Sequence, residues 1–292
     1  MPIRAILAAI LVASCWGGNF TATKFAMQDF PPFLALLLRF MGVALVLAPF
    51  ALRQPRLLRL RDMVVISMLL IVLQFALVFS AMDMGLSITS VIIATQLGTP
   101  FACILAAVVF KDYLGPWRSG GLMVAFFGVM IVAGTPNASE HWGAFALAVL
   151  GSLMWASSNI YLKCMKPSPP VVQLLFWPAL FSILPLALLS WIGESNQWTA
   201  IAEAKLSSWV GISYSLFFSS LIGYGLWNRL VTTYPMSSVV PYSLLVPVVG
   251  ISAGAIAFGE PITAQIIIGA SLTILGVGVI TLRRPQLAEL EP

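Results

Sequence analysis

Charged residues divide this chain into ten apolar stretches, and this pattern restricts its possible folds more than any other feature. Nine stretches contain no Asp, Glu, Lys or Arg, and the tenth is interrupted only by Arg39. Each has about 19–30 residues, enough for a helix across a hydrocarbon core of about 30 Å. Strands of a membrane barrel would be about 10 residues long with alternating polarity, and that pattern is missing. The stretches are residues 5–23, 30–52, 63–82, 84–110, 119–139, 142–162, 167–193, 206–228, 230–259 and 261–282.

The composition excludes a water-soluble protein. The chain is 60% hydrophobic and only 9% charged, whereas soluble domains have about 25% charged residues. A soluble enzyme, a DNA-binding domain and a disordered regulator are therefore excluded. The net charge of +5 then points to an anionic membrane surface rather than to nucleic acid. We predict an all-α polytopic membrane protein with ten transmembrane helices, whose surroundings are the lipid bilayer.

The basic residues predict how the helices are oriented. With the N-terminus inside the cell, the inner segments contain 12 of the 15 Lys and Arg residues, and the outer segments contain only Lys24 and Lys205. This bias is typical of cytoplasmic segments. We therefore expect both termini to be cytoplasmic. The inner residues are Arg4, Arg53, Arg56, Arg59, Arg61, Lys111, Arg118, Lys163, Lys166, Arg229, Arg283 and Arg284.

The two halves of the chain resemble each other. Trp16 and Asn19 have counterparts in Trp155 and Asn159. Five helices per half would make the second half enter the membrane from the opposite side. We therefore predict two inverted five-helix repeats, residues 1–137 and 138–292, an architecture of alternating-access transporters with a site near the midplane. The further pairs, each 148 positions apart, are Asp112 with Glu260, Gly121 with Gly269 and Gly128 with Gly276.

The segment Trp16-Gly-Gly-Asn19-Phe20 resembles the Trp-Gly-x-Asn-Phe signature of the drug/metabolite transporter superfamily, in its EamA-like ten-helix branch. Pro100 and Pro247, inside the fourth and ninth stretches, fit the same pattern, as does the acidic residue after each stretch. The second copy departs from the signature, because no Gly-Gly pair separates its Trp from its Asn. The resemblance covers nearly the whole chain and implies a bacterial inner-membrane exporter of small metabolites. Within the superfamily, the chain is similar to amino-acid exporters, among them the aromatic amino-acid exporters of the YddG type.

Arg39 is the one ionised residue inside a span, about 10 Å from the start of its helix at 1.5 Å per residue. Two interpretations stay open. The side chain could extend to the interface or brace neighbouring carbonyls, or it could attract a substrate carboxylate. By the spacing of the Pro-Pro pairs at 31–32 and 169–170, its counterpart is Trp177.

Polar and aromatic residues inside the spans complete the candidate substrate site. Lipid cannot satisfy amides and hydroxyls, so these side chains are expected to form interhelical hydrogen bonds or to line a cavity. Asn19 and Gln96 also lie beside glycines and a proline that could loosen their helices. Aromatic rings with amides suit a neutral, zwitterionic or aromatic solute. The candidate residues are Trp16, Asn19, Arg39, Gln74, Gln96, Thr99, Trp155, Asn159, Trp177, Tyr224 and Tyr242.

No catalytic group is evident in the spans. The single histidine, His141, falls in an expected outer loop, and no paired carboxylates lie at mid-membrane. We therefore expect a transporter without a metal or other cofactor, most simply a facilitator, and the resemblance to the EamA-like branch implies that it exports amino acids. We expect it to be a monomer or weak homodimer. Proton-coupled transporters usually keep an acidic residue in the membrane, and Asp83 and Glu260 are the nearest candidates. The alternatives are a proton-coupled drug exporter, an intramembrane enzyme acting on a lipid, and a passive channel.

Overall fold

The computed structural model describes residues 1–54, 58–111, 115–165, 170–234 and 236–282, and within these ranges it contains helices and no strand. Ten helices are long and apolar enough to cross a membrane, which confirms the expected number. Six of these spans are single α-helices, and the third, fourth, eighth and ninth each combine shorter helical segments. The helical segments are α1 (Ile3–Ala26), α2 (Pro32–Ala51), α3 (Leu60–Ile66), η1 (Ser67–Leu73), α4 (Gln74–Asp83), α5 (Ile88–Thr95), α6 (Gly98–Phe110), α7 (Pro116–Ala133), α8 (Pro136–Glu140), α9 (Trp142–Cys164), α10 (Val171–Gly193), α11 (Gln197–Glu203), α12 (Leu206–Tyr214), η2 (Ser215–Gly223), α13 (Tyr224–Thr233), α14 (Met236–Val239), η3 (Val240–Leu244), α15 (Leu245–Phe258) and α16 (Ala264–Leu282).

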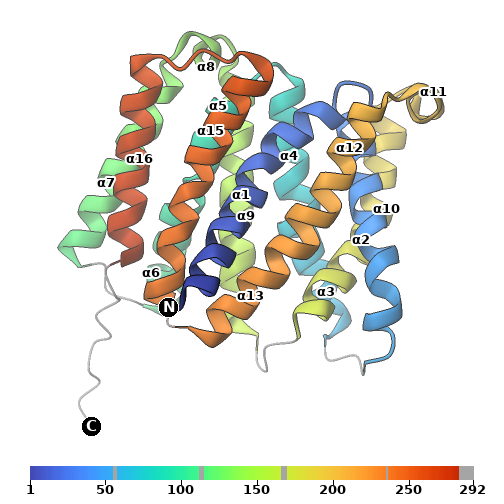
Figure 1. Cartoon of the computed structure of the whole chain (residues 1–292), viewed down its shortest axis with the longest axis horizontal. Helices are drawn as coiled ribbons and strands as arrows, with labels where there is room; N and C mark the ends of the chain where they lie inside the picture. Colours follow the sequence, from blue (N-terminus) through green and yellow to red (C-terminus); the bar gives the residue numbers. More distant parts are fainter. Residues whose placement is uncertain (55–57, 112–114, 166–169, 235, 283–292) are drawn as a thin grey trace.

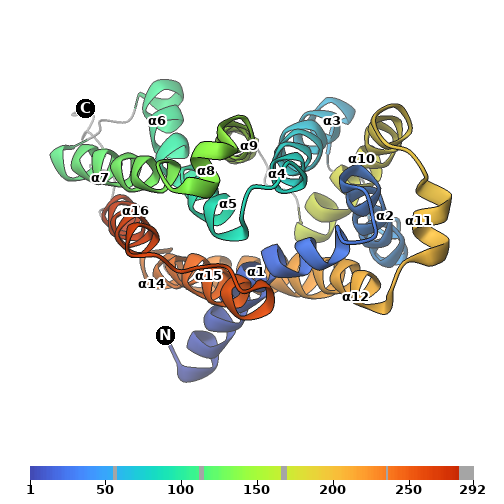
Figure 2. The same ribbon diagram turned by 90° about the horizontal axis from the view of Figure 1, so that it is seen from above.

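The spans run side by side with the N-terminus at one end of the bundle (Figure 1). We call the opposite end, where α8 and α11 lie, the distal end. Seen along the spans, α16, α15, α1 and α12 form one row that faces α7, α9 and α4 (Figure 2). The first half and the second half are interleaved, because α1 contacts α12 and α15, and α9 contacts α4 and α6. The pairs α2–α10 and α7–α16 also join the two halves.

Two π-helical segments, η1 and η2, interrupt the third and eighth spans. Their first residues, Ser67 and Ser215, are 148 positions apart, the same offset that relates the two halves of the sequence. Lys111 and Gly259, also 148 apart, both end their helices in the left-handed region, at φ 55° and 65°. Local backbone departures therefore recur at equivalent places, and nothing in the hydropathy pattern indicated the π segments.

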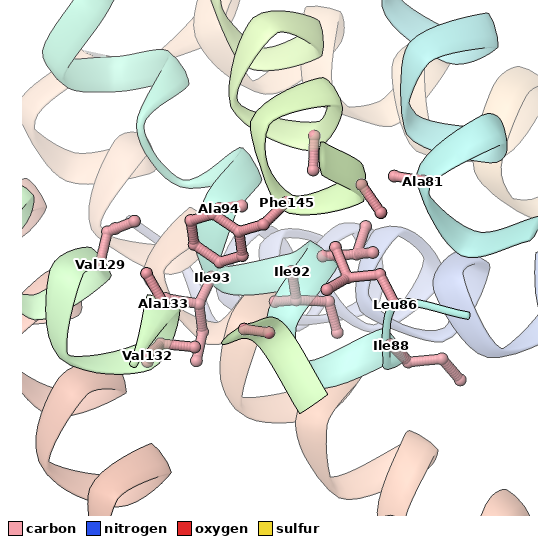
Figure 3. Packing of buried hydrophobic residues seen from close by; sticks show 14 of the residues in the cluster. Ala81, Leu86, Ile88, Ile92, Ile93, Ala94, Val129, Val132, Ala133 and Phe145 are labelled. Atoms are coloured by element: carbon pink, nitrogen blue, oxygen red, sulfur yellow. The ribbon is translucent and has the colours of Figure 1, made fainter. Parts of the chain in front are cut away.

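A cluster of buried aliphatic side chains holds the fourth span against α7 and α9 (Figure 3). Ile88, Ile92 and Ile93 of α5 are at most 1% exposed and lie with Val132 and Phe145 in this cluster. The first half of the fourth span is thus rigidly packed, and its interruption follows immediately after this packed segment.

Two sequence-based expectations need correction, and others concern residues outside the described ranges. The Gly17-Gly18 pair does not loosen the first span, since α1 is continuous from Ile3 to Ala26. The glycines instead allow close packing, because a Cβ on Gly17 would lie 2.7 Å from the Val246 carbonyl oxygen. Arg229 lies within α13 rather than in a loop. Arg56, Asp112, Lys166, Pro169, Arg283 and Arg284 lie outside the described residues.

Candidate functional site

Four of the candidate residues line one cavity of about 160 Å³ in the interior of the bundle. Gln74 comes from α4, Gln96 from the interruption between α5 and α6, Thr99 from the first turn of α6, and Trp155 from α9. Val78, Thr95, Gly151 and Ser152 complete the lining. No charged side chain contributes to it. The volume is below the roughly 300–1,000 Å³ of sites for drug-sized ligands, so the cavity suits a small uncharged or zwitterionic solute.

The interruption of the fourth span explains how polar groups reach this cavity. Regular helix ends at Thr95 and resumes at Gly98. Pro100 has no N–H to donate to the carbonyl of Gln96, four residues earlier. The amide N–H of Gln96 is shared between the carbonyls of Ile92 and Ile93, both at 3.2 Å. The backbone around Gln96 is therefore irregular where it borders the cavity, as the sequence predicted for Gly98 and Pro100.

Glycines allow Trp155 to occupy its place beside the cavity. A Cβ on Gly98 would lie 2.7 Å from Cε3 of Trp155. On α9, a Cβ on Gly151 would lie 2.8 Å from Cγ2 of Val78. Helix α4 contributes Gln74, whose side-chain oxygen Oε1 is buried and has no hydrogen-bond partner among the residues described. The cavity thus combines an indole ring with an unsatisfied amide oxygen.

Arg39 lies in a second polar cluster, on α2. Its guanidinium is 2% exposed, and its Nε and Nη2 donate to Oγ of Ser220 at 3.2 and 3.0 Å. Nη2 also lies 3.5 Å from Oγ of Ser219. Because these two serines are themselves buried, at 4% and 3% exposed, the side chain does not extend to the membrane surface. Ser219 and Ser220 were missed by the sequence reasoning, since serine in an apolar span is common and carries no pattern.

Trp16 and Tyr224 lie beside this second cluster and not beside the cavity. The indole Nε1 of Trp16 donates to the carbonyl of Ser219 at 3.3 Å, and its ring lies 5.3 Å from those of Tyr224 and Trp227. The candidate residues Trp16 and Asn19 therefore do not line the cavity with Gln96 and Trp155 in this conformation. Asn19 is 9% exposed, and its Oδ1 has no partner in the described part of the chain.

Three other candidates lie apart from both clusters. The Nδ2 of Asn159 donates to the carbonyl of Trp155 in its own helix at 2.7 Å, which satisfies it locally. Trp177 lines an apolar groove of about 400 Å³ together with Met68, Phe181 and neighbouring residues of α10. Tyr242 packs against the cluster around Ala9 and Leu230, near the N-terminal end of α1. The structure brings none of these three to the cavity.

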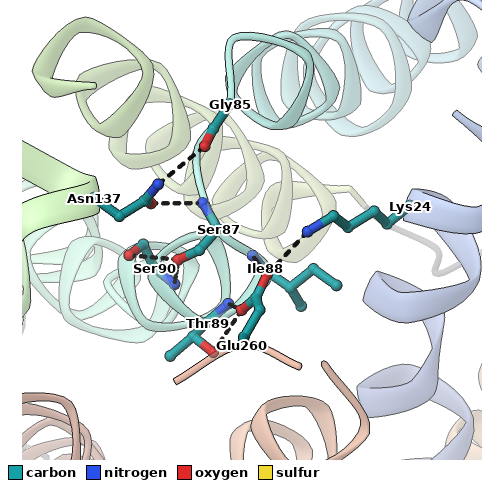
Figure 4. Close-up of polar contacts among 8 residues, drawn as sticks. All are labelled: Lys24, Gly85, Ser87, Ile88, Thr89, Ser90, Asn137 and Glu260. Atoms are coloured by element: carbon teal, nitrogen blue, oxygen red, sulfur yellow. Dashed lines mark hydrogen bonds and ion pairs between the residues drawn. The ribbon is translucent and has the colours of Figure 1, made fainter. Parts of the chain in front are cut away.

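At the distal end, Glu260 joins three parts of the chain (Figure 4). Its carboxylate accepts hydrogen bonds from the N–H groups of Ile88 and Thr89 at 2.7 and 3.0 Å, and from Oγ1 of Thr89 at 2.9 Å. Lys24 forms a salt bridge to it at 3.1 Å. Burial opposes ionisation, but the bonds from Thr89 and Ile88 outweigh it and hold the pKa of Glu260 below its ordinary value. A carboxylate at a helix N-terminus also interacts favourably with the helix dipole.

Two more carboxylates connect the halves in the same way. Glu194, after α10, accepts hydrogen bonds from the N–H groups of Phe33 and Leu34 at the start of α2. Asp29, between α1 and α2, accepts from the N–H of Lys205 at 2.8 Å and from Oγ of Ser208 at 2.7 Å, at the start of α12. Each caps a helix of the opposite half. Sequence reasoning missed these bonds because the partners are distant in the chain.

A bundle of ten apolar helices, with interrupted spans and a small polar cavity in its interior, defines a membrane transport protein. The sequence pattern of the EamA-like transporter family matches residues 3–134 and again residues 142–282. The chain therefore belongs to the EamA-like transporter family, in agreement with the resemblance noted from Trp16 to Phe20.

Named relatives agree with this assignment. Two proteins called "Probable amino-acid metabolite efflux pump", from Salmonella typhimurium and Escherichia coli, are each 30% identical over 92% of this chain and 92% of their own length. An "Uncharacterized transporter YoaV" from Bacillus subtilis is 25% identical over 94% of this chain and 96% of its own. A solved crystal structure at 16% identity superposes with a TM-score of 0.68 over 97% of this chain and 98% of the other, which shows a shared fold.

Proposed function

We propose that this transporter exports amino acids, aromatic or otherwise neutral, across the bacterial inner membrane. The observation that carries the proposal is the small cavity of amides, hydroxyls and an indole at the interruption of the fourth span. Its size favours an amino acid over a drug-sized molecule. The names of the two 30% identical relatives, both called amino-acid metabolite efflux pumps, support amino acids as the substrate class.

The proposed mechanism is alternating access between residues 1–137 and 138–292, arranged as inverted repeats. Two features support it. The interrupted segments η1 and η2 occupy equivalent positions in the two halves. The three carboxylates at the distal end join the halves there, so this conformation corresponds to one closed at that end. Release of substrate on that side would require these bonds to break.

The orientation in the membrane yields a prediction that fusion proteins can test. We expect reporter fusions after residues 57 and 292 to show a cytoplasmic location, and a fusion after residue 140 to show a periplasmic one, because 12 basic residues lie on the inner side. Alkaline phosphatase, active only in the periplasm, and a fluorescent reporter provide complementary readouts. A cytoplasmic signal from the fusion at 140 would contradict both the orientation and the inverted repeat.

A second prediction concerns the energy source. Purified protein in liposomes should carry labelled L-phenylalanine or another neutral amino acid down its gradient without an imposed pH difference. Glu260 holds its lowered pKa through bonds that close the distal end, so its carboxylate stays ionised near neutral pH. The stability that the ionised Glu260 adds to the folded protein is fully present above the ordinary pKa of glutamate. It is lost only as the pH falls through the lowered pKa of Glu260. Glu260 is therefore expected to stay ionised, and not to carry a proton, while these hydrogen bonds are intact.

The liposome assay separates a facilitator from a proton exchanger. With a pH difference of two units, one-for-one proton exchange would concentrate a neutral amino acid by up to about 100-fold. We expect the internal and external concentrations to become equal instead. Accumulation that is abolished in Asp83→Asn or Glu260→Gln would make that carboxylate the proton site. Flux that does not saturate would favour a channel, and turnover of lipid without any flux would favour an enzyme.

A further inference from the structure

Arg39 is a buried cation without an anionic partner. Among the described residues, the salt bridge between Lys24 and Glu260 is the one ion pair, and it lies at the distal end. Around the guanidinium are the hydroxyls of Ser219 and Ser220 and the rings of Phe40 and Phe75, with the ring centroids 5.1 and 4.8 Å from Cζ. The Nη1 atom of Arg39 is buried and has no hydrogen-bond partner among the residues that the structure describes.

The energetic consequence is large. An arginine inside a membrane-spanning helix is costly to insert, because its charge loses the hydration that water provides. Hydroxyl groups and phenyl faces compensate part of this cost, but they do not neutralise the charge. A structural brace between α2 and η2 would need only a hydrogen-bond donor, which an uncharged amide also supplies. The positive charge itself is thus not accounted for by the contacts of Arg39 within the protein.

The position of Arg39 relates it to the cavity. Phe75, which covers the guanidinium, directly follows the cavity-lining Gln74 in α4. Segment η1 immediately precedes these two residues, and η2 supplies both serines. Trp16 is tied to the same serine segment through the carbonyl of Ser219. Helix α4 therefore links the two places, since Phe75 covers the guanidinium and the preceding residue, Gln74, lines the cavity.

We infer that Arg39 binds the carboxylate of the transported substrate, so that the substrate class is molecules carrying one carboxylate, with the uncharged remainder in the cavity beside Gln74, Gln96 and Trp155. This inference rests on the proposed function, because the bound carboxylate belongs to the substrate that the protein is proposed to export. A carboxylate would accept hydrogen bonds from the Nη1 and Nη2 edge of the guanidinium. Because Nη1 is buried in this conformation, the carboxylate reaches it when the contacts of Phe75 and η2 with the guanidinium rearrange.

Ligand-dependent thermal unfolding of the purified protein in detergent tests the inference without any variant. The probes are L-phenylalanine, 3-phenylpropionate, which lacks the amine, and phenylethylamine, which lacks the carboxylate. We expect the two carboxylates to raise the unfolding temperature at millimolar concentration and the amine to have a much weaker effect. Equal stabilisation by phenylethylamine and L-phenylalanine would overturn the inference, and so would the absence of stabilisation by any carboxylate.

Variants assign the effect to Arg39. In Arg39→Gln, the apparent affinity for the two carboxylates should fall by about 10- to 100-fold, the range for a lost hydrogen bond to a charged group, with no change for the amine. Arg39→Lys keeps the charge and should retain part of the affinity. Lys205→Gln removes an exposed cation at the distal end and serves as the matched control. Undiminished carboxylate binding by Arg39→Gln would place the site elsewhere.

The outcomes also separate this inference from the proposed function. If liposomes show no amino-acid flux but 3-phenylpropionate stabilises the wild-type protein and not Arg39→Gln, the carboxylate site stands and the transport proposal fails. If amino acids are transported and phenylethylamine competes as well as L-phenylalanine, the transport proposal stands and Arg39 has a structural role.

Discussion

Replacement of Gln96 by leucine is expected to reduce amino-acid transport by about 10- to 100-fold. Gln96 lies at the interruption between α5 and α6 and lines the cavity. Leucine has a similar side-chain volume but lacks the amide's hydrogen-bond donor and acceptor, so a polar group of the bound substrate would be left unpaired. An unpaired buried polar group costs about 1–3 kcal/mol, which corresponds to the stated loss. The measurement is the initial rate of labelled L-phenylalanine uptake in liposomes, normalised to the amount of folded protein.

Gln265→Leu is the matched control for this change. The Nε2 of Gln265 donates to the carbonyl of Ile131 at 2.8 Å, so its amide joins α16 to α7 and does not line the cavity. Removal of such an interhelical bond costs about 0.6 kcal/mol on average in membrane proteins. We expect transport by Gln265→Leu to stay near the wild-type rate. If Gln96→Leu transports as well as Gln265→Leu, the amide of Gln96 is structural and the substrate binds elsewhere.

The second large effect is expected from Gly276→Leu, which should destabilise the protein by about 3 kcal/mol or prevent its folding. A Cβ on Gly276 would lie 2.4 Å from the backbone N of Ala125 and 2.6 Å from the carbonyl oxygen of Gly121. These are backbone atoms of α7, so the clash can be relieved only by separating α7 from α16. Overpacking of this kind typically costs 1–3 kcal/mol and occasionally more. The measurement is the thermal unfolding midpoint in detergent, together with the yield of monodisperse protein.

Gly120→Leu introduces the same side chain on α7 without the clash. A Cβ at Gly120 would meet no atom within 4 Å, and this glycine is exposed on the surface of the bundle. We expect its unfolding midpoint to stay close to that of the wild-type protein. Equal midpoints for Gly276→Leu and Gly120→Leu would show that the contact between α7 and α16 is looser than the structure indicates.

The sequence identified part of the candidate site and misplaced other parts, for reasons that particular residues make clear. The sequence predicted a broken helix beside Gln96, because Gly98 and Pro100 disrupt helix through local chemistry, and the structure confirms the interruption. Asn19 and Asn159 looked equivalent, yet Asn159 is satisfied by its own helix whereas Asn19 has an unpartnered oxygen. Whether an amide bonds within its helix depends on the side-chain conformation that the neighbouring helices permit, and no local pattern records that.

The acidic residues illustrate the same limit. Glu260, Glu194 and Asp29 each adjoin an apolar stretch of the sequence, and in the structure each lies between two helices. Their partners are N–H groups at the start of helices in the other half, 160 to 176 positions away. Free N–H groups at a helix start are present in every helix, so the sequence shows that donors exist but not which carboxylate reaches them.

The sequence by itself determined that this protein is a bundle of ten membrane-spanning helices, because a bilayer leaves no alternative for ten long apolar segments separated by charges. It also showed that Arg39 is inside a span. Only the tertiary structure decided what surrounds that charge, namely two serines of a π-helical segment and two phenyl rings. Span formation depends on hydropathy, which is a local sum over residues, whereas burial and pairing depend on which helices pack together.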